Sequence, residues 1–159
     1  MIRKIVSGGQ TGADRAALDF ALAHGFPHGG WCPRGRWAED RPLPRRYKLA
    51  ETPEDDPMQR TEWNVRDSDA TIVFSIGEAL SGGSARTEAF ARTYKKPFLH
   101  LSRQRHGTRT VTRLSSFLLV QQPDVLNIAG PRASEEPEVS DFTRQVLEQW
   151  WQNHSAARS

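Results

Sequence analysis

Short apolar runs alternate along this chain with longer stretches in which apolar residues recur at helical spacing. Four short runs predict strands over residues 3–9, 70–77, 97–102 and 124–132. The amphipathic stretches predict helices over residues 13–25, 60–69, 84–96, 107–122 and 134–151. Strands and helices that alternate with short connections favour an α/β fold, with a mostly parallel sheet and helices on both of its faces.

One segment shows neither the short apolar runs of a strand nor the apolar spacing of a helix. Residues 29–47, "GGWCPRGRWAEDRPLPRRY", are rich in Gly, Pro and Arg and predict a loop that follows a brief strand. No linker divides the chain, so residues 1–153 are expected to form a single ligand-binding domain. Residues 154–159 are expected to be a frayed C-terminal tail.

Composition narrows the function classes. The 159 residues carry a formal charge of +3, and the arginines are spread along the chain, so a nucleic-acid stripe is not expected while small anionic ligands fit well. No membrane span or signal peptide is expected. The single cysteine, Cys32, excludes an internal disulfide and favours the cytoplasm. A lone cysteine is more often a small buried hydrophobe than a ligand, and no metal site is expected.

The stretch "KIVSGGQTGADRAALDFA" joins the first strand to the first helix through three glycines. The first amides of a helix lack partners and favour a negative charge, and glycine lets a phosphate approach the backbone. We therefore expect this loop to cradle an anion. The residues that would bind it are Gly8, Gly9, Gln10, Thr11, Gly12 and Arg15.

Two further strand ends repeat this chemistry. The first follows residues 70–77 and offers Gly82, Gly83, Ser84 and Thr87, and the second offers Asn127, Gly130 and Arg132. Such loops also occur as plain tight turns, and none matches a dinucleotide-binding or P-loop signature. Three of them on one chain favour a phosphate-bearing ligand over turn chemistry alone.

The blocks "SGGQTGADRAALDFA", "GGWCPRGRWAED", "SGGSARTEAFA" and "VLNIAGPRASEEPEV" resemble those of the molybdenum cofactor carrier protein family. That family is similar to the SLOG and lysine-decarboxylase-like Rossmann proteins. The resemblance implies a Rossmann-like three-layer fold and binding of molybdenum cofactor (molybdopterin) or a nucleotide-like molecule. It also implies a homo-oligomer, either a dimer or a tetramer, and molybdoenzymes as a partner class.

The enzymes of this superfamily suggest an alternative function, the N-glycosidic hydrolysis of nucleoside monophosphates by a phosphoribohydrolase. Those enzymes carry P-G-G-x-G-T-x-x-E, whereas this chain has "SGGSARTE" from Ser81 to Glu88. Thr87 comes one place late and Glu88 one place early, and one residue turns a helix by about 100°. The shift favours a carrier over a catalyst, although Asp14 or Asp67 could replace the glutamate. A third hypothesis is an interface protein whose glycine loops are only turns.

The loop after Cys32 supplies more charged candidates. Arg34 and Arg36 are expected to bind the ligand, and Glu39 and Asp40 could close over it or remain solvated. At the other end of the chain, Trp150 and Trp151 stand side by side. A helix needs only one of the two in the core, so the other could meet a second subunit.

Overall fold

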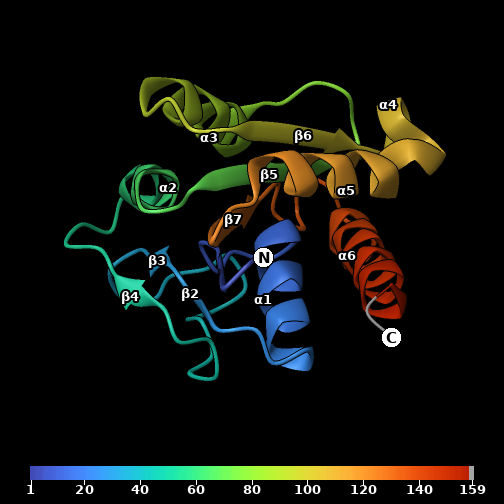
Figure 1. Cartoon of the computed structure of the whole chain (residues 1–159). Coiled ribbons are helices and arrows are strands. Elements are labelled where there is room, and N and C mark those ends of the chain that lie inside the picture. Colours follow the sequence, from blue (N-terminus) through green and yellow to red (C-terminus); the bar gives the residue numbers. More distant parts are fainter. Residues whose placement is uncertain (158–159) are drawn as a thin grey trace.

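The structure is a computed structural model that describes residues 1–157. Its main sheet has five parallel strands in the order β2-β1-β7-β5-β6 (Figure 1). Their bounds are Lys4–Val6 for β1, His28–Gly29 for β2, Ala70–Ser75 for β5, Phe98–Ser102 for β6 and Val125–Ala129 for β7. A second sheet pairs β3 with β4 in parallel. It consists of Trp31–Cys32 and Ala50–Glu51.

Helices cover both faces of the main sheet (Figure 1). The helices are α1 (Ala13–Ala23), α2 (Pro57–Arg66), α3 (Gly82–Thr93), α4 (Arg103–His106), the 3₁₀ turn η1 (Gly107–Arg109), α5 (Thr110–Gln121) and α6 (Val139–Ala156). α6 packs between α1 and α5 on one face, while α2 packs against α3 on the other. The expected Rossmann-like three-layer α/β fold is therefore confirmed.

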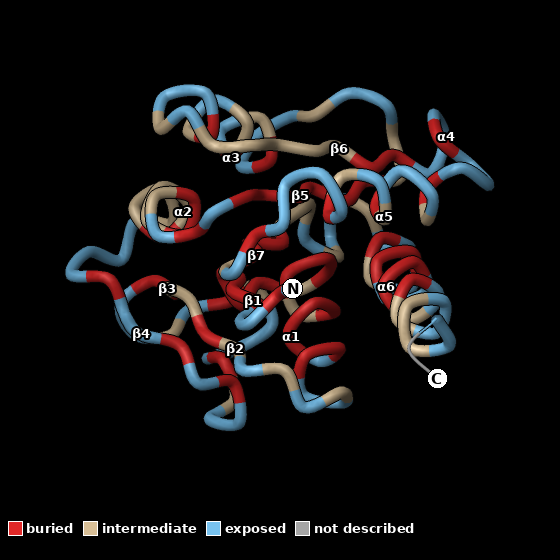
Figure 2. The backbone as a smooth tube through the Cα atoms, viewed as in Figure 1, coloured by how far each residue is buried: buried red, intermediate tan, exposed pale blue. Residues whose placement is uncertain are grey.

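The central strands are the most deeply buried part of the chain. Every residue of β5 is buried, as a strand covered on both faces must be (Figure 2). The main core joins this strand to the inner faces of α1 and α6, with Phe20, Ile72, Phe74 and Leu147 among its members. This core fixes the sheet, and with it the edge from which the ligand-binding loops emerge.

A smaller core lies under the long loop between β3 and β4. Leu18 of α1 packs there with Cys32, Leu43, Tyr47 and Leu49. Burial raises the pKa of the Cys32 thiol, which fits its expected role as a small buried hydrophobe. The loop is thus anchored to α1 by its own apolar residues.

Several elements differ from the sequence-based expectations. β2, β3 and β4 each contain two residues, which is too short for an alternating pattern to appear. α2 begins at Pro57, where the side chain of Asp56 accepts a hydrogen bond from the Met58 amide and caps the helix. Residues 154–156, assigned to a frayed tail, instead continue α6, and residues 158–159 lie outside the described part.

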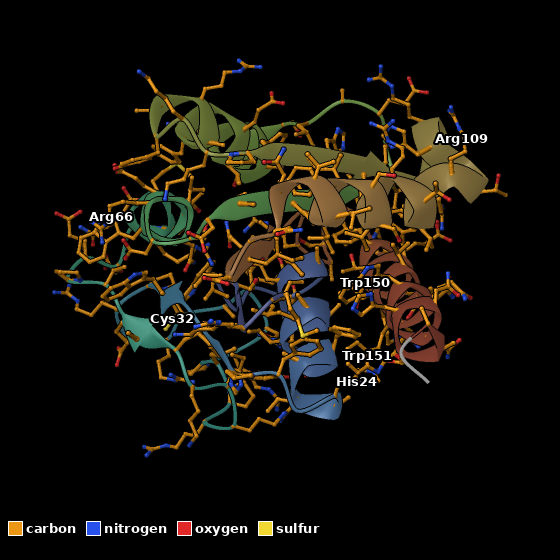
Figure 3. The ribbon with its side chains drawn as sticks, viewed as in Figure 1. His24, Cys32, Arg66, Arg109, Trp150 and Trp151 are labelled. Carbon is orange, nitrogen blue, oxygen red and sulfur yellow. The ribbon has the colours of Figure 1, made fainter. Side chains whose placement is uncertain are left out.

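The two tryptophans of α6 divide as expected (Figure 3). Trp150 is buried in the main core, and Trp151 is half-buried against Phe26 and His24, with ring centroids 5.1 and 5.3 Å apart. None of the helices within residues 1–157 is long and apolar enough to cross a membrane.

Candidate functional site

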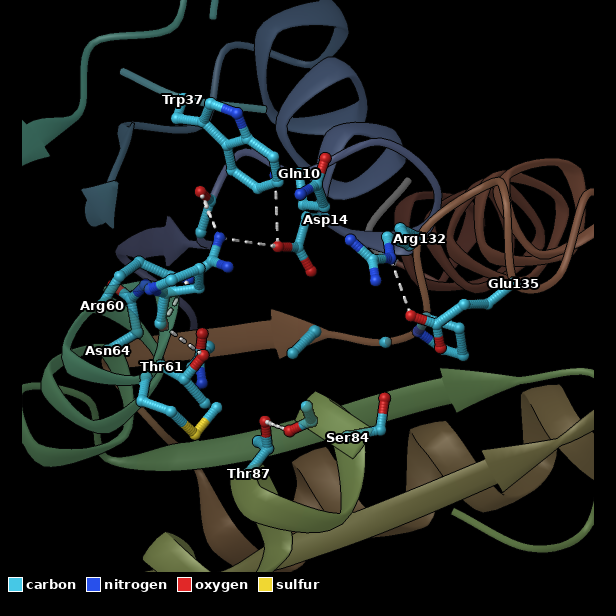
Figure 4. Close-up of a pocket in the computed structure, with 18 residues that line it drawn as sticks. Gln10, Asp14, Trp37, Arg60, Thr61, Asn64, Ser84, Thr87, Arg132 and Glu135 are labelled. Carbon is cyan, nitrogen blue, oxygen red and sulfur yellow. Dashed lines mark hydrogen bonds and ion pairs between the residues drawn. The ribbon is translucent and has the colours of Figure 1, made fainter. Parts of the chain in front are cut away.

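The three strand ends that carry glycine lie side by side. β7 pairs with β1 on one side and with β5 on the other, so the loops after these strands leave the same edge of the sheet. Ligands of open parallel sheets bind beyond this carboxyl edge. A cavity of about 240 Å³ opens there, between the starts of α1 and α3, helix α2 and the loop after β7 (Figure 4).

The structure divides the predicted site residues into two groups. Those that line the cavity are Gly8, Gln10, Gly83, Ser84, Thr87, Asn127, Gly130 and Arg132. Those that lie outside its lining are Gly9, Thr11, Gly12, Arg15, Arg34, Arg36 and Gly82. Gly82 begins α3 directly beside the lining residue Gly83, and the other members of the second group have partners elsewhere in the fold.

Polar groups in and beside the first glycine loop already have hydrogen-bond partners within the protein. Arg15 donates to Asp40 at 2.8 Å and to the carbonyl of Gly9 at 3.1 Å, and Thr11 donates to Glu39. Partial desolvation raises the pKa of Glu39, but hydrogen bonds from Ser134 and Thr11 outweigh it and lower the pKa overall. Glu39 and Asp40 thus close over the start of α1, where the sequence predicted a ligand anion.

Gly9 packs against the long loop between β3 and β4. Its φ of +80° suits glycine, and a Cβ there would lie 2.8 Å from a methyl carbon of Leu43 and 3.1 Å from one of Leu49. Gly12, with φ of +84°, faces the backbone of the loop after β7, where a Cβ would collide with the carbonyl of Pro131. Both glycines let neighbouring loops pack closely.

Arg36 holds the long loop together. Its guanidinium donates to four backbone carbonyls, at 3.2, 3.3, 2.9 and 2.7 Å, which belong to Leu43, Leu49, Pro44 and Tyr47. The side chain of Arg34 is exposed and lies away from the cavity. Neither arginine faces the space that a ligand would fill.

The start of α3 is the part of the edge whose donors remain free. The amides of Gly82 and Gly83 donate to no acceptor within the described chain, and a Cβ at either position would meet open space. Ser84 is 6% exposed, its hydroxyl makes no hydrogen bond in residues 1–157, and it points into the cavity (Figure 4). These groups form a donor set at a helix N-terminus.

Other donors near α3 are already satisfied. The amides of Ile76 and Gly77, at the end of β5, donate to the carboxylate of Glu136 at 2.8 and 2.9 Å. The Thr87 hydroxyl donates to the carbonyl of Gly83 at 2.9 Å. The free donors are therefore concentrated in the first turn of α3, at Gly82, Gly83 and Ser84.

The end of β7 forms the floor of the cavity. Asn127 is buried and donates through Nδ2 to the Thr71 hydroxyl at 3.2 Å. Arg132 lines the rim, where its Nε donates to Glu135 at 2.8 Å. A Cβ at Gly130 would meet Ala13 and the carbonyl of Phe74, so this glycine allows the loop to cross between β5 and α1.

The sequence analysis assigned no binding role to the pair on the opposite wall, Asp14 and Arg60. Arg60 Nη1 lies 3.8 Å from Asp14 Oδ2 and donates to the carbonyl of Gly8 at 2.8 Å. Burial raises the pKa of Asp14 to about 6, although the charge of Arg60 opposes this. Burial likewise lowers the pKa of Arg60. A carboxyl on the first turn of a helix at a strand end was the available signal for Asp14.

Trp37 and Asn64 also contribute to the cavity. Trp37 is 47% exposed and lies at the rim (Figure 4). Asn64 is buried and exchanges two hydrogen bonds with the backbone of Trp31, at 2.8 and 3.0 Å, which fix α2 beside β3. Arg60 and Asn64 both belong to α2, and the sequence analysis predicted no ligand-binding residue in that helix.

Of the carboxylates considered for hydrolysis, Asp14 lines the cavity, whereas Glu88 and Asp67 lie outside its lining. Glu88 forms an i,i+4 ion pair with Arg92 at 3.4 Å and does not line the cavity. Asp67 accepts from Arg66 at 2.8 Å and from the indole of Trp31 at 2.9 Å. Within residues 1–157 no group of three or more His, Cys, Asp or Glu could hold a metal ion.

Comparisons with known proteins give the family of the chain. Residues 5–151 match the family described as the circularly permutated YpsA SLOG family. A crystal structure titled "Putative molybdenum carrier protein", from Syntrophus aciditrophicus SB, is similar over 94% of both chains, with 51% identity and a TM-score of 0.91. No curated protein matches the chain. Because the family match spans almost all of the sequence, the chain belongs to the circularly permuted YpsA branch of the SLOG family.

Proposed function

We propose that this protein binds and carries a phosphate-bearing ligand, which is molybdopterin-type molybdenum cofactor or a related nucleotide-like molecule, without turning it over. The free donors at the start of α3 carry this proposal. The amides of Gly82 and Gly83 and the hydroxyl of Ser84 present three donors at the positive end of a helix dipole. A phosphate oxygen is the natural acceptor for such a group.

The size of the cavity supports a small ligand. A volume of about 240 Å³ lies just below the usual range for ligand pockets, so it suits a single ring system with one phosphate better than a dinucleotide. The name of the Syntrophus protein supports molybdenum cofactor as the cargo. In that case the free donors at the start of α3 would hold the phosphate of the metal-bearing pterin.

The hydrolase alternative receives less support. Base cleavage needs a carboxylate within hydrogen-bond reach of the attacking water or the ribose. Glu88 is paired with Arg92 outside the cavity, and Asp14 is held beside Arg60. Incubation with nucleoside monophosphates should therefore release no free base, and turnover above about 1 per second would overturn the carrier proposal.

Replacing Gly83 tests the phosphate subsite directly. A Cβ at Gly83 meets nothing within 4 Å, so Gly83→Val should fold, while its side chain occupies the place of a phosphate oxygen. We expect the affinity for GMP, used as a phosphorylated probe in calorimetry, to fall at least tenfold. Ala89→Val, at an exposed position of the same helix, is the matched control.

Native mass spectrometry of the purified protein complements this titration, because it reports any retained pterin or nucleotide. Equal GMP affinity in Gly83→Val and Ala89→Val would remove the subsite from the start of α3. The cytoplasmic location, the homo-oligomer and the molybdoenzyme partners stay predictions, and they fit a carrier that delivers a cofactor.

A further inference from the structure

The wall of the cavity that faces Ser84 carries an acceptor and a donor side by side. Figure 4 shows Asp14, Arg60 and Trp37 grouped across the cavity from Ser84 and Thr87. Asp14 comes from the first turn of α1 and Arg60 from the middle of α2. The two side chains are 9% and 10% exposed, so their polar atoms face the cavity and have little contact with bulk solvent.

Asp14 has acceptor capacity to spare. Its Oδ2 accepts a long hydrogen bond of 3.3 Å from the amide of Gln10, and the amide of Gly130 also faces the carboxylate. Arg60 Nη1 lies 3.8 Å away, which is an ion pair beyond hydrogen-bond distance. An ionised carboxylate has about four lone-pair sites, and a buried one is costly when they remain empty.

Arg60 has a donor to spare. Its Nη1 donates to the carbonyl of Gly8 at 2.8 Å, and its Nε donates to the carbonyl of Pro57 at 3.3 Å. Its Nη2 makes no hydrogen bond to any of the described residues, and this atom keeps some accessible surface. Two of the three guanidinium nitrogens therefore hold the backbone, while the third is available to a ligand.

Trp37 completes the group with a flat surface. It is the largest half-exposed aromatic side chain at the cavity, and its indole contacts no other aromatic ring within residues 1–157. Ring systems of nucleotides and related heterocycles stack on such side chains. Trp37 can therefore offer a face for stacking, while Asp14 offers acceptors for the edge of the same ring.

We propose that Asp14, Arg60 and Trp37 form a subsite for a heterocycle with a 2-amino-4-oxo edge, the edge that guanine and the pterins share. The ring N–H and the exocyclic amino group of this edge donate to Asp14, and the neighbouring oxo group accepts from Arg60 Nη2. Trp37 stacks on the ring. This inference rests on the proposed function, because the phosphate of the same ligand would occupy the start of α3.

The same pair disfavours other rings. Adenine places a ring nitrogen acceptor next to its amino group, and that acceptor would face the lone pairs of Asp14. Hypoxanthine lacks the exocyclic amino group and so loses one of the two donors. Well-placed pairs of hydrogen bonds to base edges discriminate by roughly 10- to 100-fold in affinity.

The test compares GMP, IMP and AMP in calorimetric titrations at pH 7.5 and constant ionic strength. We expect GMP to bind about tenfold more tightly than IMP and at least tenfold more tightly than AMP. In Asp14→Asn the advantage of GMP over IMP should fall below about threefold. Trp37→Ala should weaken all three nucleotides by a similar factor of about ten, and Asp141→Asn, an exposed carboxylate on α6, is the matched control.

A parallel titration with the phosphate monoester of 6-hydroxymethylpterin distinguishes a pterin from guanine as the preferred ring. Circular dichroism verifies that each variant folds. If GMP, IMP and AMP bind the unaltered protein equally, or Asp14→Asn weakens all three by the same factor, the subsite is overturned and the Asp14–Arg60 pair is purely structural. These results would leave the proposed phosphate subsite intact. That subsite would be overturned by a different result, in which Gly83→Val binds GMP as tightly as its control Ala89→Val does.

Discussion

Asp14 makes the stability of this protein depend on pH in an unusual direction. Burial raises its pKa from 3.8 to about 6 in the folded chain, so between these pH values the folded state holds a proton that the unfolded state has released. Stability contributed by this group is therefore present below about pH 4 and is lost as pH rises through 6. The shift corresponds to roughly 3 kcal/mol at neutral pH.

Asp14→Asn should remove this penalty. Relative to the unaltered protein, the variant should gain stability as pH rises from 4 to 7, which is a change of several degrees in the difference between their Tm values. Thermal unfolding across this range measures it. The ordinary carboxylates with lowered pKa, such as Glu39 and Asp40, cancel in the difference. A difference in Tm that does not vary with pH would show that Asp14 is not a buried acid of raised pKa.

The sequence located only part of the cavity at the residue scale. Ser84 and Gly83 could be predicted because a helix N-terminus after a strand is a local feature, visible in a few neighbouring letters. Arg60 and Trp37 could not, since their place in the cavity depends on how α2 and the long loop pack against the sheet. The ion pair between Arg15 and Asp40, outside the cavity lining, was equally invisible in the sequence, where Arg15 was predicted to bind a phosphate.

The long loop between β3 and β4 keeps a defined shape although it contains no helix or strand. Backbone carbonyls that would be paired in a helix or sheet accept hydrogen bonds from Arg36 instead, four in all. Leu43, Tyr47 and Leu49 anchor the loop through apolar packing. Hydrogen bonds to charged groups contribute more than neutral ones, about 1.5–3 kcal/mol each before losses from non-additivity. The loop in turn positions Trp37 at the rim of the cavity and Glu39 over the start of α1.

Arg36→Met should consequently destabilise the protein by about 3 kcal/mol or more, because four carbonyls lose their donor while the aliphatic stem is kept. Chemical denaturation followed by fluorescence measures the change. Arg34→Met, two residues away and exposed, should change the free energy of unfolding by less than about 0.5 kcal/mol. Equal effects of the two substitutions would contradict the structural role of Arg36.

The regular elements could be predicted where their periodicity was strong. β5, with six buried residues, and the amphipathic helices α1, α3 and α5 emerged within a few residues of their bounds. The two-residue strands could not, because so short a segment is defined by its hydrogen-bonded neighbour and not by its own composition. The strand order β2-β1-β7-β5-β6 is likewise a tertiary property, and it is what gathers the three glycine-bearing loops.

At the scale of the whole molecule, an apolar surface lies far from the ligand cavity. A groove of about 520 Å³ runs between the C-terminal ends of α5 and α6, lined by Phe26, Leu119 and Trp151 among others. Leu119 is 74% exposed, and its neighbour Val120 is 75% exposed. Exposed apolar side chains beside an apolar groove are typical of a surface that another molecule covers.

We expect this surface to join copies of the chain, in line with the homo-oligomer predicted from the sequence. Light scattering at micromolar concentration should give the mass of a dimer or tetramer. Leu119→Glu places a charge in the groove and should shift the protein toward the monomer with its secondary structure intact, because burying an unpaired charge is strongly unfavourable. Thr112→Glu, exposed on the same helix, should leave the mass unchanged. A monomeric unaltered protein would exclude the homo-oligomer, and an oligomer that survives Leu119→Glu would place its interface elsewhere.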